Sequence, residues 1–208
     1  MGALKDLNIL PIIHKYDTKV FVETGLGLST GVMRIMQPEF GMRGIISIDI
    51  DKDLVDHAIK TFKFDSRILI LNMHSVDGLK HILPQVRLEY PILAFLDAHF
   101  MASDYHLDDR KLNKHSDGDV SKRLPLWDEL KTWKSIRIDR GAKDVIICDD
   151  IFLYSRDNHF DDNVERLGSG AVPDDQRDYL PKFIELFKET HIPKIIYEAQ
   201  GTLMLLPK

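Results

Sequence analysis

The sequence is poor in cysteine: its single cysteine, Cys148, lies in the apolar run 144–148. One cysteine cannot form a disulfide bond within the chain, and it cannot supply the paired thiolates of a typical structural zinc site. A buried, reduced thiol is the simplest interpretation of Cys148. We therefore expect a protein of a reducing compartment, the cytoplasm.

Long apolar runs are also missing. The longest, 91–100, is interrupted by Asp97, whereas a membrane-spanning helix needs about 20 apolar residues. Residues 1–15 contain no basic segment followed by a long apolar stretch, so we expect no cleaved signal peptide. The formal net charge is −5, and binding to a phosphate backbone requires an excess of positive charge. We expect no membrane partner and no nucleic-acid partner.

The chain does contain a regular alternation of short β-rich runs and helical segments. The predicted strands are 19–23, 44–49, 67–71, 91–97 and 144–148, followed by a hairpin of 194–199 and 202–206. The predicted helices are 29–37, 52–63, 76–83, 125–135 and 176–190. This pattern predicts an α/β, doubly wound, mostly parallel sheet with an antiparallel C-terminal strand pair.

The length of 208 residues suits a single domain covering 1–208, because no repeat and no linker divides the chain. Two polar, turn-rich stretches, about 103–123 and 155–175, follow predicted strands. Open α/β sheets bind ligands at the carboxyl ends of their strands. We interpret the two stretches as loop insertions that cover an active site or hold a substrate. Ordinary surface insertions are the alternative.

A glycine-containing turn follows the first predicted strand, in the order Glu23-Thr24-Gly25-Leu26-Gly27. Glycines at 25 and 27 permit a tight turn and let a ligand approach the bare backbone. Asp49 ends the next strand, where a carboxylate can accept hydrogen bonds from ribose hydroxyls. The combination predicts a nucleoside-containing ligand, whereas the glycines alone are equally compatible with a purely structural turn.

Glu23 narrows the choice of ligand, because a carboxylate directly before the glycines repels a pyrophosphate and suits an ammonium or sulfonium group. With an acid before a Gly-x-Gly turn and a second acid at Asp49, the chain resembles class I S-adenosylmethionine-dependent methyltransferases. Ser29 stands where their usual turn has a third glycine. The resemblance implies seven strands, the last one antiparallel, and S-adenosylmethionine as the methyl donor.

The same resemblance implies roles for individual residues. Glu23, Gly25 and Gly27 form the donor-binding turn, with Glu23 and Gly25 facing the methionine part and Asp49 the ribose. Ser75, after the third strand, lies against the adenine in this interpretation. A helix N-cap explains Ser75 equally well.

Three aspartates follow two neighbouring strands: Asp97 after the fourth, and Asp149 and Asp150 after the fifth. Clustered carboxylates repel one another unless they are protonated or bridged by a cation. Oxygen ligands favour a hard ion such as Mg2+. The arrangement resembles metal-dependent O-methyltransferases of the catechol and macrolide-sugar types. Helix capping by strand-end aspartates is the alternative.

His99 lies two residues beyond Asp97, and the two are our candidate catalytic residues. His99 could act as a general base, serve as a further metal ligand, or be only a hydrogen-bonding spacer. Catechol-type enzymes place a lysine where this chain has Phe100, which weakens the case for a catechol substrate. Glu129, in the helix 125–135, could reach the site, but a surface position on the helix is the preferred interpretation.

These features lead to a hypothesis of methyl transfer from S-adenosylmethionine to a small hydroxylated acceptor, with O-methylation assisted by a divalent metal. A homodimer is compatible with the sequence. One alternative is a nucleotide-dependent oxidoreductase of Rossmann type, which Glu23 disfavours. The other is a non-catalytic nucleoside-binding module whose strand-end aspartates only cap helices.

Overall fold

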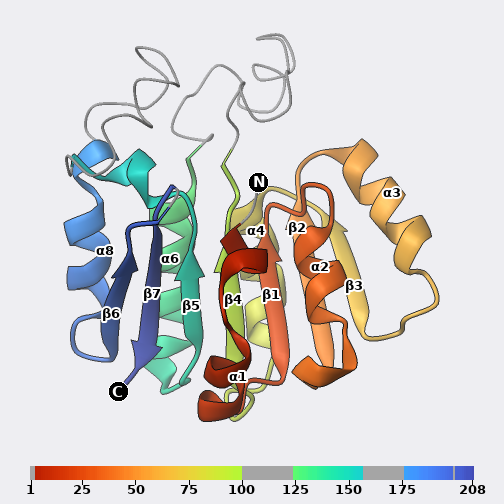
Figure 1. Ribbon diagram of the computed structural model, residues 1–208, viewed down its shortest axis with the longest axis horizontal. Helices are drawn as coiled ribbons and strands as arrows, with labels where there is room; N and C mark the ends of the chain where they lie inside the picture. Colours follow the sequence, from red (N-terminus) through yellow and green to blue (C-terminus); the bar gives the residue numbers. More distant parts are fainter. Residues whose placement is uncertain (1–2, 100–123, 157–175, 199) are drawn as a thin grey trace, which may run out of the picture.

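The computed structural model describes residues 3–99, 124–156, 176–198 and 200–208 (Figure 1). Its strands are β1 (Val20–Thr24), β2 (Gly44–Asp49), β3 (Ile68–Asn72), β4 (Ile92–Leu96), β5 (Val145–Cys148), β6 (His191–Ile196) and β7 (Thr202–Pro207). Its α-helices are α1 (Leu10–Tyr16), α2 (Thr30–Ile35), α3 (Lys52–Phe62), α4 (Ser75–Ile82), α6 (Leu126–Ile136) and α8 (Leu180–Phe187). The two predicted loop insertions lie almost entirely outside the described residues.

The strands form one seven-stranded sheet in the order β3-β2-β1-β4-β5-β7-β6. Strands β1 to β5 are parallel, and β7 is antiparallel to both β5 and β6. The predicted doubly wound fold with an antiparallel C-terminal pair is therefore confirmed. The strand order reverses between β1 and β4, and such a reversal is where open α/β sheets bind ligands.

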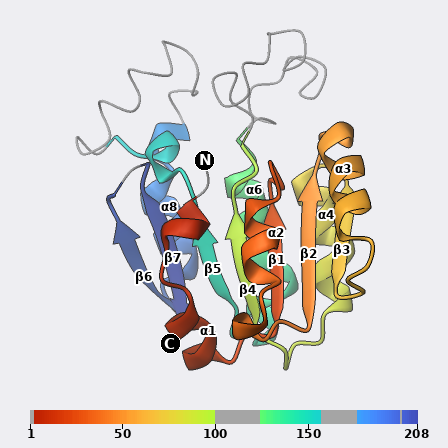
Figure 2. The ribbon, with the colours of Figure 1, turned by 45° about the vertical axis from the view of Figure 1, so that its right-hand side comes forward.

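Helices cover both faces of the sheet (Figures 1 and 2). Alternate residues of a strand point to opposite faces, and neighbours in β1 show this clearly. Phe21 belongs to the hydrophobic cluster shared with α1, α2 and α3. Val22 belongs to the cluster shared with α4, α6 and α8. With both faces buried, the strands need the nearly continuous apolar runs seen in the sequence.

The predictions were least accurate near the two ends of the chain. Helix α1 was not predicted, although it buries Ile13 on the sheet. The predicted helix 176–190 is a short α8, with Pro181 in its first turn. Strand β6 begins at His191, before the predicted start at 194, and includes Pro193, which an edge strand tolerates. No helix in the described ranges is long and apolar enough to cross a membrane.

A buried ion pair lies at the amino ends of β4 and β5, away from the ligand-binding edge. Asp144 and Arg137 are both fully buried. The Arg137 guanidinium donates to both carboxylate oxygens of Asp144, at 2.6 and 2.9 Å. Asp144 also accepts from the Trp133 indole and from the backbone N–H of Ile92, each at 2.9 Å. One carboxylate thus connects α6 to the starts of two central strands.

Candidate functional site

The glycine turn after β1 packs directly against the end of β4. Gly25 has φ +83° and Gly27 has φ +49°, both in the left-handed region that glycine adopts without strain. The Gly25 N–H donates to the Ile48 carbonyl at 2.9 Å. A Cβ on Gly25 would overlap with the carbonyl oxygen of Asp97. The turn therefore needs glycine for its conformation and also for the space between two strand ends.

Asp49 connects the end of β2 to this turn. Its carboxylate accepts from the backbone N–H of Asp51 at 2.8 Å and from that of Gly27 at 3.2 Å. Burial raises the pKa of Asp49, and the two N–H donors act against this shift. The carboxylate is thus held at the edge of the turn, and its role toward a ribose stays a prediction.

Glu23 lies inside the protein, on the face of the sheet that α2 covers. It is 2% exposed and accepts a hydrogen bond of 2.6 Å from the Ser47 hydroxyl. A Cβ on Gly31 would overlap with its other carboxylate oxygen. Burial raises the pKa of Glu23 to about 8, with Ser47 acting against the shift. Near neutral pH the carboxyl group is therefore mostly protonated.

Glu23 should consequently make protein stability depend on pH. Between the ordinary pKa of 4.5 and about 8, the folded protein keeps a proton that the unfolded chain has released. The free energy of unfolding therefore falls as the pH rises through this window. Replacing Glu23 by Gln should remove the effect, stabilising the variant relative to wild type by about 3 kcal/mol more at about pH 8 than at about pH 5.

Urea denaturation at a series of pH values measures this difference. Glu39→Gln is the matched control, because Glu39 is exposed and the substitution removes the same charge. Parallel stability curves for wild type and Glu23→Gln would show that Glu23 titrates normally in the folded protein.

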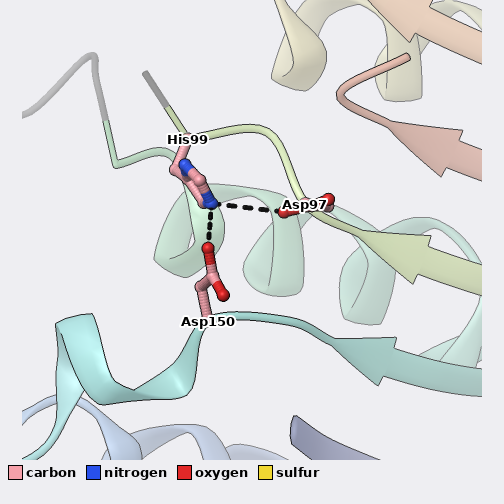
Figure 3. Close-up of side chains that lie close together, drawn as sticks. All are labelled: Asp97, His99 and Asp150. Atoms are coloured by element: carbon pink, nitrogen blue, oxygen red, sulfur yellow. Dashed lines mark hydrogen bonds and ion pairs between the residues drawn. The ribbon is translucent and has the colours of Figure 1, made fainter. Parts of the chain in front are cut away.

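The strand-end groups Asp97, His99 and Asp150 meet at the carboxyl ends of β4 and β5 (Figure 3). His99 Nε2 lies 3.3 Å from Asp97 Oδ1 and is hydrogen-bonded to Asp150 Oδ2. One ligand atom from each residue lies within 4.8 Å of the others. The side chains are 19%, 14% and 9% exposed, in sequence order, so the cluster is shielded but accessible. Two carboxylates and one imidazole can hold a divalent cation or orient the imidazole as a base.

Adjacent aspartates after β5 point in different directions. Asp149 is held to the strand end, where its N–H donates to Leu96 and its Oδ1 accepts from the Thr202 hydroxyl at 3.3 Å. Asp150 has φ 50° and ψ 40°, a left-handed conformation that is uncommon for a residue other than glycine. This turn directs Asp150 to His99. The structure thus places Asp97 and Asp150 of the predicted metal set together, with His99, and Asp149 outside the cluster.

Ser75 and Glu129 lie beneath the same edge of the sheet, between α4 and α6. Ser75 is the first residue of α4 and does not cap it; the N-cap position is His74. Glu129 is 1% exposed, so its interpretation as a surface residue was wrong. Burial raises the pKa of Glu129 to about 7, and the nearby hydroxyls of Ser75 and Thr24 act against this shift. The missed signal is the stripe of buried α6 residues Leu126, Glu129, Leu130 and Trp133, which has helical spacing and includes Glu129.

The sheet order, the antiparallel C-terminal pair and a glycine turn at the switch point define a Rossmann-like fold of the class I methyltransferase type. The sequence matches no family model and no curated protein. Solved structures show the similarity. A candidate caffeoyl-CoA O-methyltransferase from Staphylococcus aureus matches with a TM-score of 0.62 and 11% identity, over 96% of this chain and 81% of that one.

Two further structures agree on the fold. An O-methyltransferase from Bacillus cereus, solved in complex with S-adenosylhomocysteine, matches with a TM-score of 0.57 and 15% identity, over 100% of this chain and 82% of that one. The methyltransferase domain of bacterial CtHen1-CN matches with a TM-score of 0.51 and 11% identity, over 96% and 95% of the two chains. At these identities the likeness establishes the fold that the sequence motifs predicted.

Proposed function

We propose that this protein is an S-adenosylmethionine-dependent methyltransferase that methylates a hydroxyl group of a small acceptor, with a divalent cation assisting. The observation that carries the proposal is the contact between the Gly25 turn and the backbone of Asp97. Because of this contact, the predicted donor site lies directly beside the Asp97–His99–Asp150 cluster. A methyl donor and an acceptor bound at these two places would be neighbours, and such alignment is a large source of rate acceleration.

Donor binding is assigned to the residues around the glycine turn. Gly25 and Gly27 let the donor approach the backbone, and Asp49 lies beside them at the position proposed for the ribose. Support comes from the Bacillus cereus O-methyltransferase, a protein of the same fold that binds S-adenosylhomocysteine.

The acceptor side is assigned to Asp97, His99 and Asp150. Their two carboxylates and one imidazole fit a divalent cation, and the imidazole extends the choice from Mg2+ to ions such as Mn2+ or Zn2+. A cation bound there would lower the pKa of an acceptor hydroxyl. Without a cation, the His99 Nε2–H would donate to Asp97 and Asp150, Nδ1 would be the nitrogen that takes the hydroxyl proton, and the two carboxylates would stabilise the protonated imidazole.

Calorimetric titration with S-adenosylhomocysteine tests the donor, with NADH as the competing ligand. We expect S-adenosylhomocysteine to bind and NADH not to bind. No affinity for S-adenosylhomocysteine would overturn the proposal, and tight NADH binding would support an oxidoreductase. Transfer of a labelled methyl group to one compound in a panel of catechols, sugars and polyketides separates an enzyme from a non-catalytic binding module.

Titration with Mg2+ and Mn2+ tests the metal. We expect His99→Asn and Asp150→Asn each to weaken metal binding by at least about tenfold, since they remove direct ligands. Asp128→Asn, on the exposed side of α6, is the control and should bind normally. The variant Asp149→Asn separates the two ligand sets. If it loses as much affinity as Asp150→Asn while His99→Asn loses none, the all-carboxylate set is correct and the set proposed here is wrong.

A further inference from the structure

The end of β1 has a buried acid on each face of the sheet. Glu23 lies on the α2 face, where its carboxyl group is enclosed by Ser47 and Gly31. Thr24, the next residue, points to the opposite face, where it lies near Glu129. Glu23, the acid directly before the glycines, is therefore engaged by contacts within the protein. Glu129 is a second acid, and it lies beneath the same turn.

The buried carboxyl group of Glu129 lacks hydrogen-bond partners among the described residues. In the described part of the chain, neither of its oxygens has a partner with hydrogen-bond geometry, and the hydroxyls of Thr24 and Ser75 are also without one. The two hydroxyls lie near the carboxyl group, but short of hydrogen-bond geometry. A buried polar group without partners costs about 1–3 kcal/mol. Four such atoms in one place indicate that a ligand completes the cluster.

The charge around Glu129 identifies the kind of ligand. Asp97 adds further negative charge, and His99 is the only described group with a basic side chain among those that affect the Glu129 carboxyl. A cation would balance these carboxylates. A primary ammonium group has three N–H donors and no acceptor, which matches one carboxylate and two hydroxyl oxygens. A neutral amino group on an aromatic ring would leave the charge unbalanced.

We propose that Glu129 binds the ammonium group at the aminoacyl end of the methyl donor, with Thr24 and Ser75 completing its hydrogen bonds. This inference rests on the proposed function. Side-chain rotamer changes are common when a site takes up its ligand, so the covered position of Glu129 does not exclude contact. Glu129 would then fill the role that the sequence suggested for Glu23, and Ser75 would face the aminoacyl end of the donor instead of the adenine.

The test compares S-adenosylhomocysteine with its analogue that lacks only the amino group. Glu129→Gln should weaken binding of S-adenosylhomocysteine by about 10- to 100-fold, the effect of losing a charged hydrogen bond, and change binding of the analogue less than about twofold. The exposed Glu39→Gln is the control and should affect neither ligand. Glu23→Gln, on the other face, is the comparison: a selective loss of S-adenosylhomocysteine binding in this variant, with none in Glu129→Gln, would assign the ammonium group to Glu23 and overturn the proposal. Binding of S-adenosylhomocysteine by the wild type tests the proposed function separately.

Equal losses for both ligands in Glu129→Gln would overturn the proposal, because the residue would then act on the adenine or on the fold. An unchanged affinity for both would overturn it as well. Thermal unfolding gives an independent readout: removing a buried, unpartnered acid should leave the melting temperature unchanged or higher, whereas a purely structural residue would lower it. Should Glu129→Gln fail to fold, Ser75→Ala must weaken S-adenosylhomocysteine selectively by about threefold or more.

Discussion

Replacing Asp144 by Ala is expected to lower the free energy of unfolding by about 3–5 kcal/mol, the typical cost of breaking a buried ion pair. The substitution would leave the fully buried guanidinium of Arg137 without its carboxylate. It would also leave the Trp133 indole N–H and the Ile92 backbone N–H without their acceptor. Arg137 would keep only the carbonyl oxygens of Val86 and Tyr90, which accept its other N–H groups but do not balance its charge.

Urea denaturation measures this loss, and Asp139→Ala is its control. Asp139 pairs with Lys134 in the same region, but its side chain is 51% exposed. An exposed pair contributes about 0–1 kcal/mol, so the control should unfold almost as the wild type does. Similar losses in the two variants would show that the buried position of Asp144 confers no special stability. The double variant Arg137→Met, Asp144→Leu should recover much of the loss, because it leaves no buried charge unpaired.

Replacing Gly25 by Ala is expected to weaken binding of S-adenosylhomocysteine by at least about 100-fold, equivalent to about 3 kcal/mol. Two physical effects act together. An alanine at φ +83° is strained, and its Cβ would overlap with the Asp97 carbonyl oxygen. Because that oxygen belongs to the backbone at the end of β4, the overlap can be relieved only by moving the strand end or the turn. Either movement changes the proposed donor site.

Gly141→Ala separates backbone strain from steric overlap. Gly141 has φ +90°, but a Cβ there would have no neighbour within 4 Å. This control should lose about 1 kcal/mol of stability through backbone strain and bind S-adenosylhomocysteine normally. If Gly25→Ala folds and binds within about tenfold of the wild type, the turn does not hold the donor in the proposed way.

Much of the central fold was predictable because local pattern and tertiary environment agree there. The strand at 44–49 was predicted with the bounds that β2 has, since its apolar residues serve a sheet buried on both faces. The local sequence pattern predicted the elements near the two ends of the chain less well. Helix α1 has only seven residues, too few for a clear periodicity, and its stability comes from packing Ile13 on the sheet. The start of β6 was predicted too late, and Pro193 fits within β6 because the strand lies at the edge of the sheet, which is a property of the tertiary structure.

For the site, the sequence by itself determined which chemical groups reach the ligand-binding edge. Asp49 ends one parallel strand, and Asp97 and Asp150 follow two others; parallel strands in one sheet end at the same edge. The tertiary structure alone decided which groups face one another. The left-handed turn at Asp150 separates it from Asp149, and the packing of α2 and α6 against opposite faces encloses Glu23 and buries Glu129. The spacing of residues along the sequence does not predict these contacts. The direction of a side chain at a strand end depends on backbone dihedrals and on neighbours distant in the chain.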